Sequence, residues 1–144
     1  MLVRQILKSK PSGEVATIGP AASVKEAAES LSAKRIGALI VTRDGARPEG
    51  IISERDIVRE LGRRGPACMS ETVAGIMTAE LIGCALDETA DQVLAKMTEG
   101  RFRHMPVLED GRMVGLISIG DVVKARLSEL SMEKEALQGM IMGH

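Results

Sequence analysis

Residues 50–58 read GIISERDIV, and residues 115–123 read GLISIGDVV. In both stretches a glycine precedes a short apolar run, the run ends at a serine, and an aspartate follows three residues later. A short apolar run of this kind suits a buried strand. A serine with an acidic residue three positions on is typical of a helix start. The sequence therefore predicts the same strand-to-helix junction twice.

The similarity extends beyond these two stretches. A shift of 66 residues aligns 23–45 with 89–111, and a shift of 65 aligns 50–59 with 115–124. Of the 33 aligned pairs nine are identical, four in the first block and five in the second. We therefore expect two related units of about 60 residues each.

The repeat also has an upstream part. Val3 and Ile6 match Val73 and Ile76, and the first copy has a loop four residues longer near residues 9–13. Alternation, helical spacing and turn residues predict the same β-α-β-β-α order in both units. In the first unit the elements are a strand at 15–18, a helix at 24–34 capped by Ser23, strands at 37–42 and 50–52 around an Asp44-Gly45 turn, and a helix at 56–62. In the second they are a strand at 81–85, a helix at 90–99 capped by Thr89, strands at 104–108 and 113–117 around an Asp110-Gly111 turn, and a helix at 119–130, with an amphipathic extension to about Met140.

Two tandem β-α-β-β-α units that each close with Gly-apolar-apolar-Ser-x-x-Asp resemble a CBS-domain pair, or Bateman module. The resemblance spans the chain from about Leu2 to Lys124. It implies a mixed α+β fold of the α/β type, with two units packed with pseudo-two-fold symmetry. The expected divisions are unit 1 at 1–65, unit 2 at 66–126 and a C-terminal helical extension at 127–144. It also implies a regulatory module that binds AMP, ADP, ATP, NAD(H) or S-adenosylmethionine and signals to a partner protein that the sequence does not name.

The chemistry of the repeated motif agrees with such a ligand. Asp56 and Asp121 are acceptors able to take hydrogen bonds from two ribose hydroxyls, with Ser53 and Ser118 beside them. The N-terminus of the following helix offers free N–H groups that suit a phosphate. The alternative is that each serine and aspartate only caps a helix. The duplication with constant spacing favours ligand binding.

The two copies differ around the motif. Arg103 and His104 supply a cation and a donor that we expect beside Asp121, and Met105 and Pro106 offer an aliphatic surface for an adenine. Gly37 and Ala38 stand at the corresponding positions of the first unit and carry no charge. The sequence therefore predicts that the Asp121 cleft is the better nucleotide site and that Asp121→Ala weakens binding more than Asp56→Ala. By the same resemblance, Arg55 reaches a phosphate in the neighbouring site. A solvated Arg103 and an ordinary half-buried His104 remain the alternative.

Composition excludes several other functions. The single aromatic residue, Phe102, argues against recognition of nucleic acid by base stacking, and a net charge of −1 argues against a duplex-binding surface. The longest apolar run, 37–41, is far shorter than the roughly 20 residues of a membrane span. The N-terminus shows no signal peptide. Two cysteines are too few for a disulfide framework, so we expect a cytosolic protein.

No catalytic group is evident in the sequence. A serine nucleophile needs a histidine base, and His104 is the only internal histidine. Cys68 and Cys84 do not have the spacing of a zinc site. We therefore expect a protein that is not an enzyme and has no catalytic cofactor. The second helices and the C-terminal extension, with Met132, Met140 and Met142, are expected to form a homodimer. A ligand-free interaction module and a small nucleotide-processing enzyme remain as alternatives.

Overall fold

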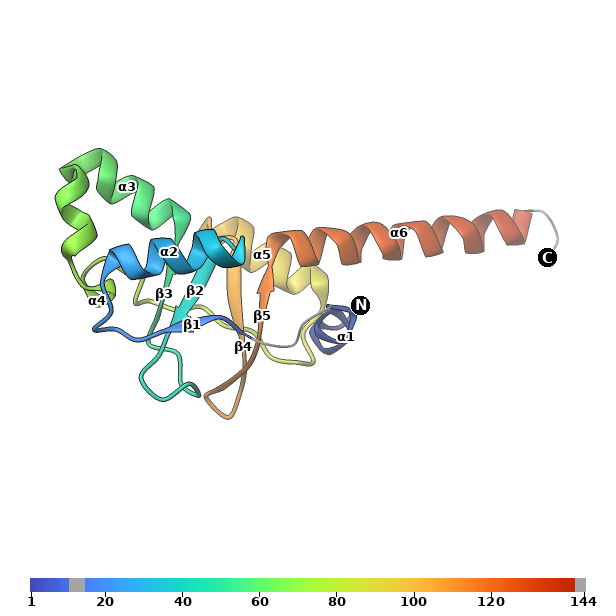
Figure 1. Ribbon diagram of the computed structural model, residues 1–144. Helices are drawn as coiled ribbons and strands as arrows, with labels where there is room; N and C mark the ends of the chain where they lie inside the picture. Colours follow the sequence, from blue (N-terminus) through green and yellow to red (C-terminus); the bar gives the residue numbers. More distant parts are fainter. Residues whose placement is uncertain (11–14, 142–144) are drawn as a thin grey trace.

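The chain folds into two units that lie side by side, with one long helix projecting from the second (Figure 1). The computed structural model describes residues 1–10 and 15–141. The long loop predicted near residues 9–13 falls mostly outside these residues, as does Met142. No helix of the described part is long and apolar enough to cross a membrane.

The first unit is a three-stranded sheet with two helices. Strand β2 (Ala38–Val41) lies between β1 (Thr17–Ile18), to which it is parallel, and β3 (Gly50–Ser53), to which it is antiparallel. The register of β2 and β3 places Ala38 opposite Ser53. Helices α2 (Val24–Lys34) and α3 (Glu54–Arg64) follow β1 and β3. These elements confirm the predicted order for this unit.

The second unit has two strands rather than the three predicted. Strands β4 (His104–Glu109) and β5 (Arg112–Ser118) are antiparallel, and helices α5 (Ala90–Gly100) and α6 (Ile119–Ile141) accompany them. The predicted strand at 81–85 is wrong, because the chain meets β4 there only at Cys84, in a single parallel bridge to Val107. Ile82 is exposed and Gly83 packs tightly against Leu108, so the segment lacks the alternation that supports a longer strand.

Three short helices lie outside the predicted pattern, and two of them, α1 and α4, pack into the unit that their own sequence position does not predict. They are α1 (Val3–Ser9), the 3-10 helix η1 (Pro66–Ser70) and α4 (Val73–Ile76). Val3 and Ile6 of α1 enter the core of the second unit, while Val73 and Ile76 of α4 enter that of the first. The two cores therefore do not follow the predicted boundary between residues 65 and 66. Helix α1, which precedes the first unit in the sequence, completes the core of the second, and α4, which precedes the second unit, completes the core of the first.

This exchange explains the glycine at the start of each repeated stretch. A Cβ on Gly115 would come within 2.8 Å of Leu7 Cδ1, beside α1. A Cβ on Gly50 would come within 2.9 Å of the Thr78 carbonyl oxygen, beside α4. A larger residue at position 50 would press on the backbone that follows α4, whereas one at position 115 would force the Leu7 side chain of α1 to shift.

The helix starts have the caps that the sequence predicts. Ser23 Oγ accepts a hydrogen bond from the Glu26 N–H at 3.0 Å, and Thr89 Oγ1 accepts one from the Gln92 N–H at 3.2 Å. Helices α2 and α5 end at equivalent arginines, Arg35 and Arg101, with left-handed φ of 55° and 57°. This conformation turns the chain sharply toward the strand that follows each helix, β2 in the first unit and β4 in the second.

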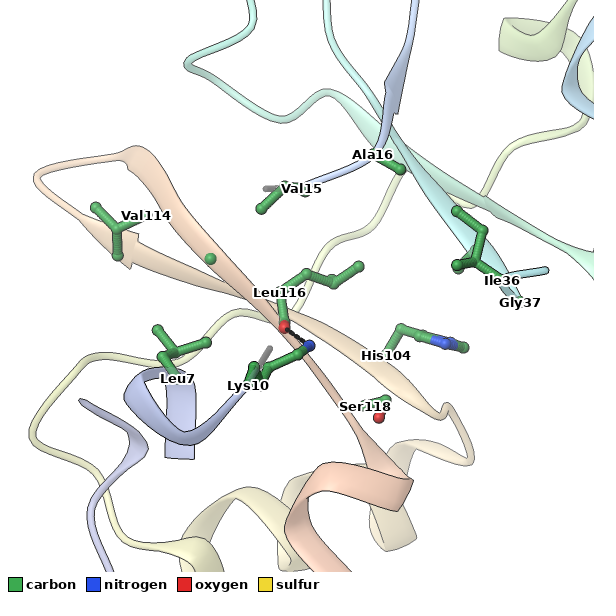
Figure 2. Close-up of a pocket in the computed structure, with 12 residues that line it drawn as sticks. Leu7, Lys10, Val15, Ala16, Ile36, Gly37, His104, Val114, Leu116 and Ser118 are labelled. Atoms are coloured by element: carbon green, nitrogen blue, oxygen red, sulfur yellow. Dashed lines mark hydrogen bonds between the residues drawn. The ribbon is translucent and has the colours of Figure 1, made fainter. Parts of the chain in front are cut away.

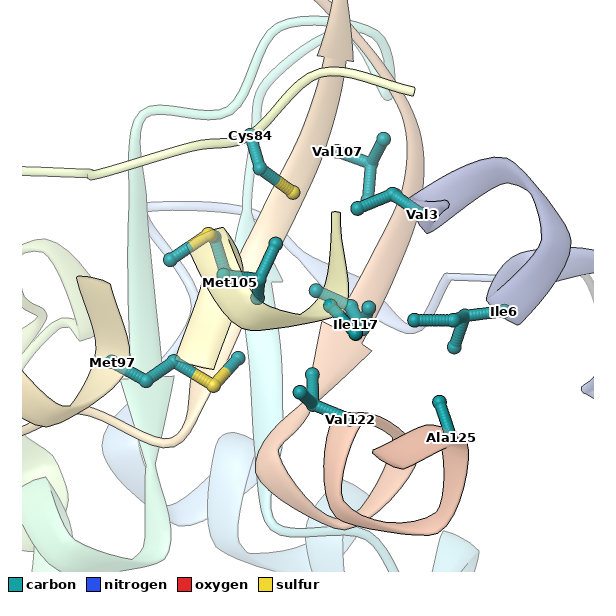
Figure 3. Packing of buried hydrophobic residues seen from close by; sticks show 11 residues of the cluster. Val3, Ile6, Cys84, Met97, Met105, Val107, Ile117, Val122 and Ala125 are labelled. Carbon is teal, nitrogen blue, oxygen red and sulfur yellow. The ribbon is translucent and has the colours of Figure 1, made fainter. Parts of the chain in front are cut away.

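Aliphatic and methionine side chains form the core of the second unit (Figure 3). Met97, Met105 and Ile117 are almost fully buried there. Helix α6 contributes only Val122 and Ala125 to the buried set and then continues away from the body of the molecule (Figure 1). Its exposed part carries large apolar side chains: Leu127, Leu130, Met132, Leu137, Met140 and Ile141. The predicted helical extension is confirmed to Ile141.

Candidate functional site

The carboxylate of Asp56 lies at the junction of β3 and α3 and is only 4% exposed. Its Oδ2 accepts hydrogen bonds from the N–H and the hydroxyl of Ser53, at 2.9 and 3.0 Å. Its Oδ1 accepts from the Arg59 guanidinium at 3.0 Å and from the Thr78 hydroxyl at 3.4 Å. The capping role that the sequence left open is therefore present. The other carboxylate oxygen, Oδ1, contacts Arg59 and Thr78, which are not part of the cap.

Asp121 occupies the equivalent place at the junction of β5 and α6. Its Oδ2 accepts from the Ser118 N–H at 2.8 Å and from the Lys10 ammonium at 2.9 Å, while the Asp121 N–H donates to Ser118 Oγ at 3.1 Å. Burial alone raises the pKa of this carboxyl. The bonds from Ser118 and the charge of Lys10 outweigh that effect and hold the pKa below its ordinary value. Asp121 is therefore ionised at neutral pH.

A large cleft of about 720 Å³ lies in front of Asp56 and is called here the Asp56 cleft. It is lined from both units by Gly37, Ile51, Ser53, Glu54, Arg55, Asp56, Arg59, Thr78, Glu80, Leu81, Ile82, Gly100, Arg101, Phe102, Arg103 and His104. The lining holds four arginines and three carboxylates, together with apolar side chains and two hydroxyls. Its volume and mixed lining are those of a small-molecule site.

A second cleft of about 320 Å³, the Asp121 cleft, opens beside Ser118 and Lys10 (Figure 2). Its lining residues are Leu7, Lys10, Val15, Ala16, Ile36, Gly37, Ala38, His104, Val114, Gly115, Leu116 and Ser118. Most of these are apolar. Figure 2 shows Val15, Ala16 and Ile36 of the first unit facing Leu116 and His104 of the second across the opening.

The structure corrects which residues accompany which aspartate. Arg103 lines the Asp56 cleft rather than the Asp121 cleft, and Ala38 lines the Asp121 cleft rather than the Asp56 cleft. Arg55 lines the cleft of its own motif. The reason is that the segment entering β2 lines the cleft beside the second unit's motif, and the segment entering β4 lines the cleft beside the first unit's motif. The predicted placement of Arg103 beside Asp121 is therefore wrong, since the arginines gather around Asp56, while the ranking of the two clefts as nucleotide sites stays a prediction.

Gly37 and His104 lie where the two clefts meet, and each lines both. A Cβ on Gly37 would stand 3.4 Å from His104 Cε1 and 3.5 Å from Glu54 Oε1. Burial lowers the pKa of the His104 imidazole and outweighs the nearby Asp121 carboxylate, which favours the charged form. His104 is therefore a neutral donor and acceptor between the clefts at pH 7.

The predicted adenine surface lies elsewhere. Met105 is fully buried in the core of the second unit, and Pro106 is buried with its carbonyl accepting the Cys84 N–H at 3.0 Å. Neither lines either of the two clefts. Met105 lies on the face of β4 opposite to His104 and packs in the core. The only aromatic side chain, Phe102, instead lines the Asp56 cleft while packing against the core.

Sequence reasoning missed Lys10, Thr78, Glu80, Arg101 and Phe102. A signal for them was present in the repeat. The match of Val3 and Ile6 with Val73 and Ile76 places Lys10 at the position of Glu80, which shows that both segments serve equivalent clefts. Arg101 is the equivalent of the identical Arg35. Their assignment to particular clefts depends on the crossing of the chain between units, which the repeat alone does not define.

The family model for the CBS domain matches this chain twice, over residues 3–63 and 73–128. The chain therefore belongs to the CBS-domain family and carries two CBS units in tandem. It is 37% identical over 125 residues to the CBS domain-containing protein CBSX3, mitochondrial, of Arabidopsis thaliana. That match covers 84% of this chain and 61% of the relative. The chain thus spans less than two thirds of that relative's length.

Solved structures share the whole fold. The CBS-domain containing protein ATU1752 from Agrobacterium tumefaciens is 44% identical, with a TM-score of 0.83 over 88% of this chain and 99% of that one. The CBS domain pair of MJ0100, in complex with 5′-methylthioadenosine and S-adenosyl-L-methionine, is 29% identical, with a TM-score of 0.76 over 87% and 98%. The CBS domain protein PAE2072 from Pyrobaculum aerophilum, complexed with AMP, is 26% identical, with a TM-score of 0.77 over 92% and 99%. The predicted fold class is confirmed.

Proposed function

We propose that this protein is a regulatory module that binds an adenosine-containing ligand in the clefts between its two CBS units. One observation carries the proposal: each cleft is lined by the motif of one unit, through Ser53 and Asp56 or through Ser118, and by the strand-entry segment of the other. A ligand in either cleft therefore touches both units. The ligands of MJ0100 and PAE2072 share an adenosine moiety, which supports this ligand class.

The roles of the residues follow from their chemistry. Asp56 and Asp121 take the ribose hydroxyls, because a carboxylate accepts two hydrogen bonds side by side. At Asp56 the hydroxyls replace the bonds that Arg59 and Thr78 make to Oδ1. Ser53 and Ser118 fix the carboxylates through the cap bonds described above. Gly37 leaves room beside His104 for the base or sugar to pass between the clefts.

The Asp56 cleft is the better site for a ligand with phosphates. Arg55, Arg59, Arg101 and Arg103 all line it, and guanidinium groups bind phosphate oxygens in a bidentate manner. Phe102, Ile51 and Leu81 provide apolar surface for an adenine. AMP, ADP, ATP and NAD(H) fit this combination of charges. S-Adenosylmethionine, whose sulfonium is cationic, is less suited to a cleft lined by four arginines.

Regulation then follows from the position of the ligand. A ligand that bridges the units shifts their relative orientation only if it binds two orientations with different affinity. We propose that a partner protein senses this shift and that the module itself performs no turnover. The exposed apolar face of α6 supports a homodimer in which two chains form a disc of four CBS units. The cytosolic location stays a prediction.

A panel of thermal-shift measurements tests the proposal. AMP, ATP, NAD and S-adenosylmethionine are each added to the pure protein, and a ligand that binds the native state raises the melting temperature by mass action. The expected result is a rise that grows with ligand concentration for at least one of them. Chromatography of the same samples must recover the ligand intact. Conversion of the ligand would favour an enzyme, and no shift with any ligand would favour a ligand-free interaction module.

A further inference from the structure

Lys10, which lines the Asp121 cleft, is held against Asp121, the motif carboxylate of the second unit. The residue ends helix α1, and its ammonium donates to Asp121 Oδ2 and to the Leu116 carbonyl oxygen, both at 2.9 Å. The side chains of Lys10 and Asp121 are 29% and 22% exposed. Figure 2 shows the lysine ammonium meeting the Leu116 carbonyl oxygen on β5. The chain therefore brings a cation to this site from 111 residues away in the sequence.

The first unit neutralises its aspartate differently. Asp56 is paired with Arg59, three residues further along its own helix, and the repeat places the acidic Glu80 at the position of Lys10. Lys124, the equivalent of Arg59, is exposed. The contact of Lys10 with Asp121 is thus a difference between the two clefts and not a feature that the duplication requires.

This contact limits how Asp121 meets a ligand. A carboxylate oxygen offers about two acceptor directions, and Oδ2 already receives the Ser118 N–H and the Lys10 ammonium. A ribose that uses both oxygens of the carboxylate needs the direction that Lys10 holds. The Ser118 bond belongs to the helix cap, so the lysine is the group that must move.

We infer that Lys10 determines the specificity of the Asp121 cleft: it competes with the ribose hydroxyls for Asp121 and, once displaced, pairs with an anionic group on the ligand. This inference rests on the proposed function and deepens it. A nucleoside without a phosphate has to displace the lysine and gives it no new partner. A nucleoside monophosphate displaces it and offers a phosphate in return. The cleft is therefore selective for the phosphorylated form.

The surroundings of Lys10 give the displaced ammonium few other partners. The cleft is lined mainly by apolar side chains, including Leu7, Val15 and Leu116. Among the described residues, the polar side chains that line it besides Lys10 are those of Ser118 and the neutral His104. A half-buried cation without a partner is unfavourable, while a charge-assisted bond to phosphate is favourable. Charge removal at position 10 should therefore act in opposite directions on the two kinds of ligand.

Methyl-resolved NMR titrations of the full chain test this. Shifts of the Leu7 and Leu116 methyls report the Asp121 cleft, and shifts of the Ile51 and Leu81 methyls report the Asp56 cleft separately. Adenosine and AMP are titrated into the natural protein, into Lys10→Met and into the matched control Lys8→Met, whose lysine is exposed on the same helix. At the Asp121 cleft, Lys10→Met should bind adenosine about 3-fold more tightly and AMP about 5-fold more weakly, the scale of a partly exposed ion pair.

The ratio of AMP affinity to adenosine affinity at the Asp121 cleft should thus fall roughly 15-fold in Lys10→Met, which is on the scale of two exposed ion pairs. The same ratio should stay constant in Lys8→Met. A preference unchanged within about twofold, or one that falls equally in Lys8→Met, overturns the role of Lys10 while the proposed function stands. So does a gain in affinity for both ligands, which would make the lysine a simple obstruction. If neither ligand shifts the methyls of either cleft in the natural protein, the proposed function itself fails.

Discussion

The two arginines that the second unit places beside Asp56 provide the sharpest contrast between the clefts. Arg101 and Arg103 line the Asp56 cleft together with Arg55 and Arg59, and both are exposed. Neither of the two forms an ion pair with any of the described residues. Their guanidinium groups are therefore available to a ligand phosphate, and Arg101→Ala and Arg103→Ala should weaken the binding of AMP.

The expected magnitude follows from their exposure. A hydrogen bond to a charged group contributes roughly 1.5–3 kcal/mol in a desolvated site. Exposed ion pairs contribute about 1 kcal/mol or less. Since both arginines lie at the open edge of the cleft, we take about 1 kcal/mol for each, or about a fivefold loss of AMP affinity for each single variant. The double variant should lose about 30-fold, if the two effects add.

Isothermal titration calorimetry at two salt concentrations measures this loss. Adenosine lacks the phosphate, so its affinity should be unchanged in all variants. The difference between AMP and adenosine should also shrink in high salt, because exposed charges are screened. Arg112→Ala is the matched control, since Arg112 is an exposed arginine at the start of β5, outside both clefts. Equal losses for AMP and adenosine, or a loss as large in Arg112→Ala, would refute the assignment of the phosphate to this cleft.

Four further results are expected. Asp56→Ala should lower the unfolding free energy by about 1–3 kcal/mol more than Asp121→Ala does, as measured by chemical denaturation. Asp56 is more buried and accepts hydrogen bonds from Ser53, Arg59 and Thr78. Equal losses of unfolding free energy in the two variants would contradict this. Gly50→Ala should lower the unfolding free energy by about 1–3 kcal/mol in chemical denaturation. The added Cβ would stand 2.5 Å from Met77 Sδ and 2.9 Å from the Thr78 carbonyl oxygen. Gly62→Ala is the control and should not destabilise, because a Cβ there meets nothing within 4 Å. Burial lowers the pKa of His104 in the folded protein, so the unfolded chain protonates this imidazole first as the pH falls. The unfolding free energy should therefore decline below about pH 6.5. In urea titrations between pH 7 and 5, His104→Gln should reduce the slope of unfolding free energy against pH. Leu130→Glu with Leu137→Glu should convert the proposed dimer to a monomer in light scattering without changing the melting temperature of the monomeric body, since both side chains are exposed on α6; an unchanged mass would exclude this face.

Local sequence signals predict most of the fold because they act within one element. Ser23, Ser53 and Thr89 cap helices at the predicted places, and the apolar stretches around Leu39 and Ile117 form buried strands. These preferences depend on spacing along the chain. The strand predicted at 81–85 fails because its pairing depends on a partner, β4, that only Cys84 meets with hydrogen bonds.

The candidate site was predictable only in part, since each cleft is assembled across the two units. Ser53, Asp56, Ser118 and Asp121 are defined by one local motif and lie where the motif predicts. The partners of those motifs come from distant segments. Arg103 belongs to the same repeat unit as Asp121, but it lines the cleft of Asp56. Lys10 bonds to Asp121 because α1 packs on the second unit, and no local pattern near residue 10 indicates that packing.

Ligand binding between the units is the central claim, and one NMR titration of the unaltered protein with AMP addresses it most directly. Ile51 of the first unit and Ile82, which precedes α5 of the second, both line the Asp56 cleft. We predict that AMP shifts the methyl signals of both residues along one saturable curve, while the methyls of Leu137 on the far part of α6 stay unchanged. Absence of a saturable shift at Ile51 and Ile82, or saturable shifts confined to α6, would contradict the account.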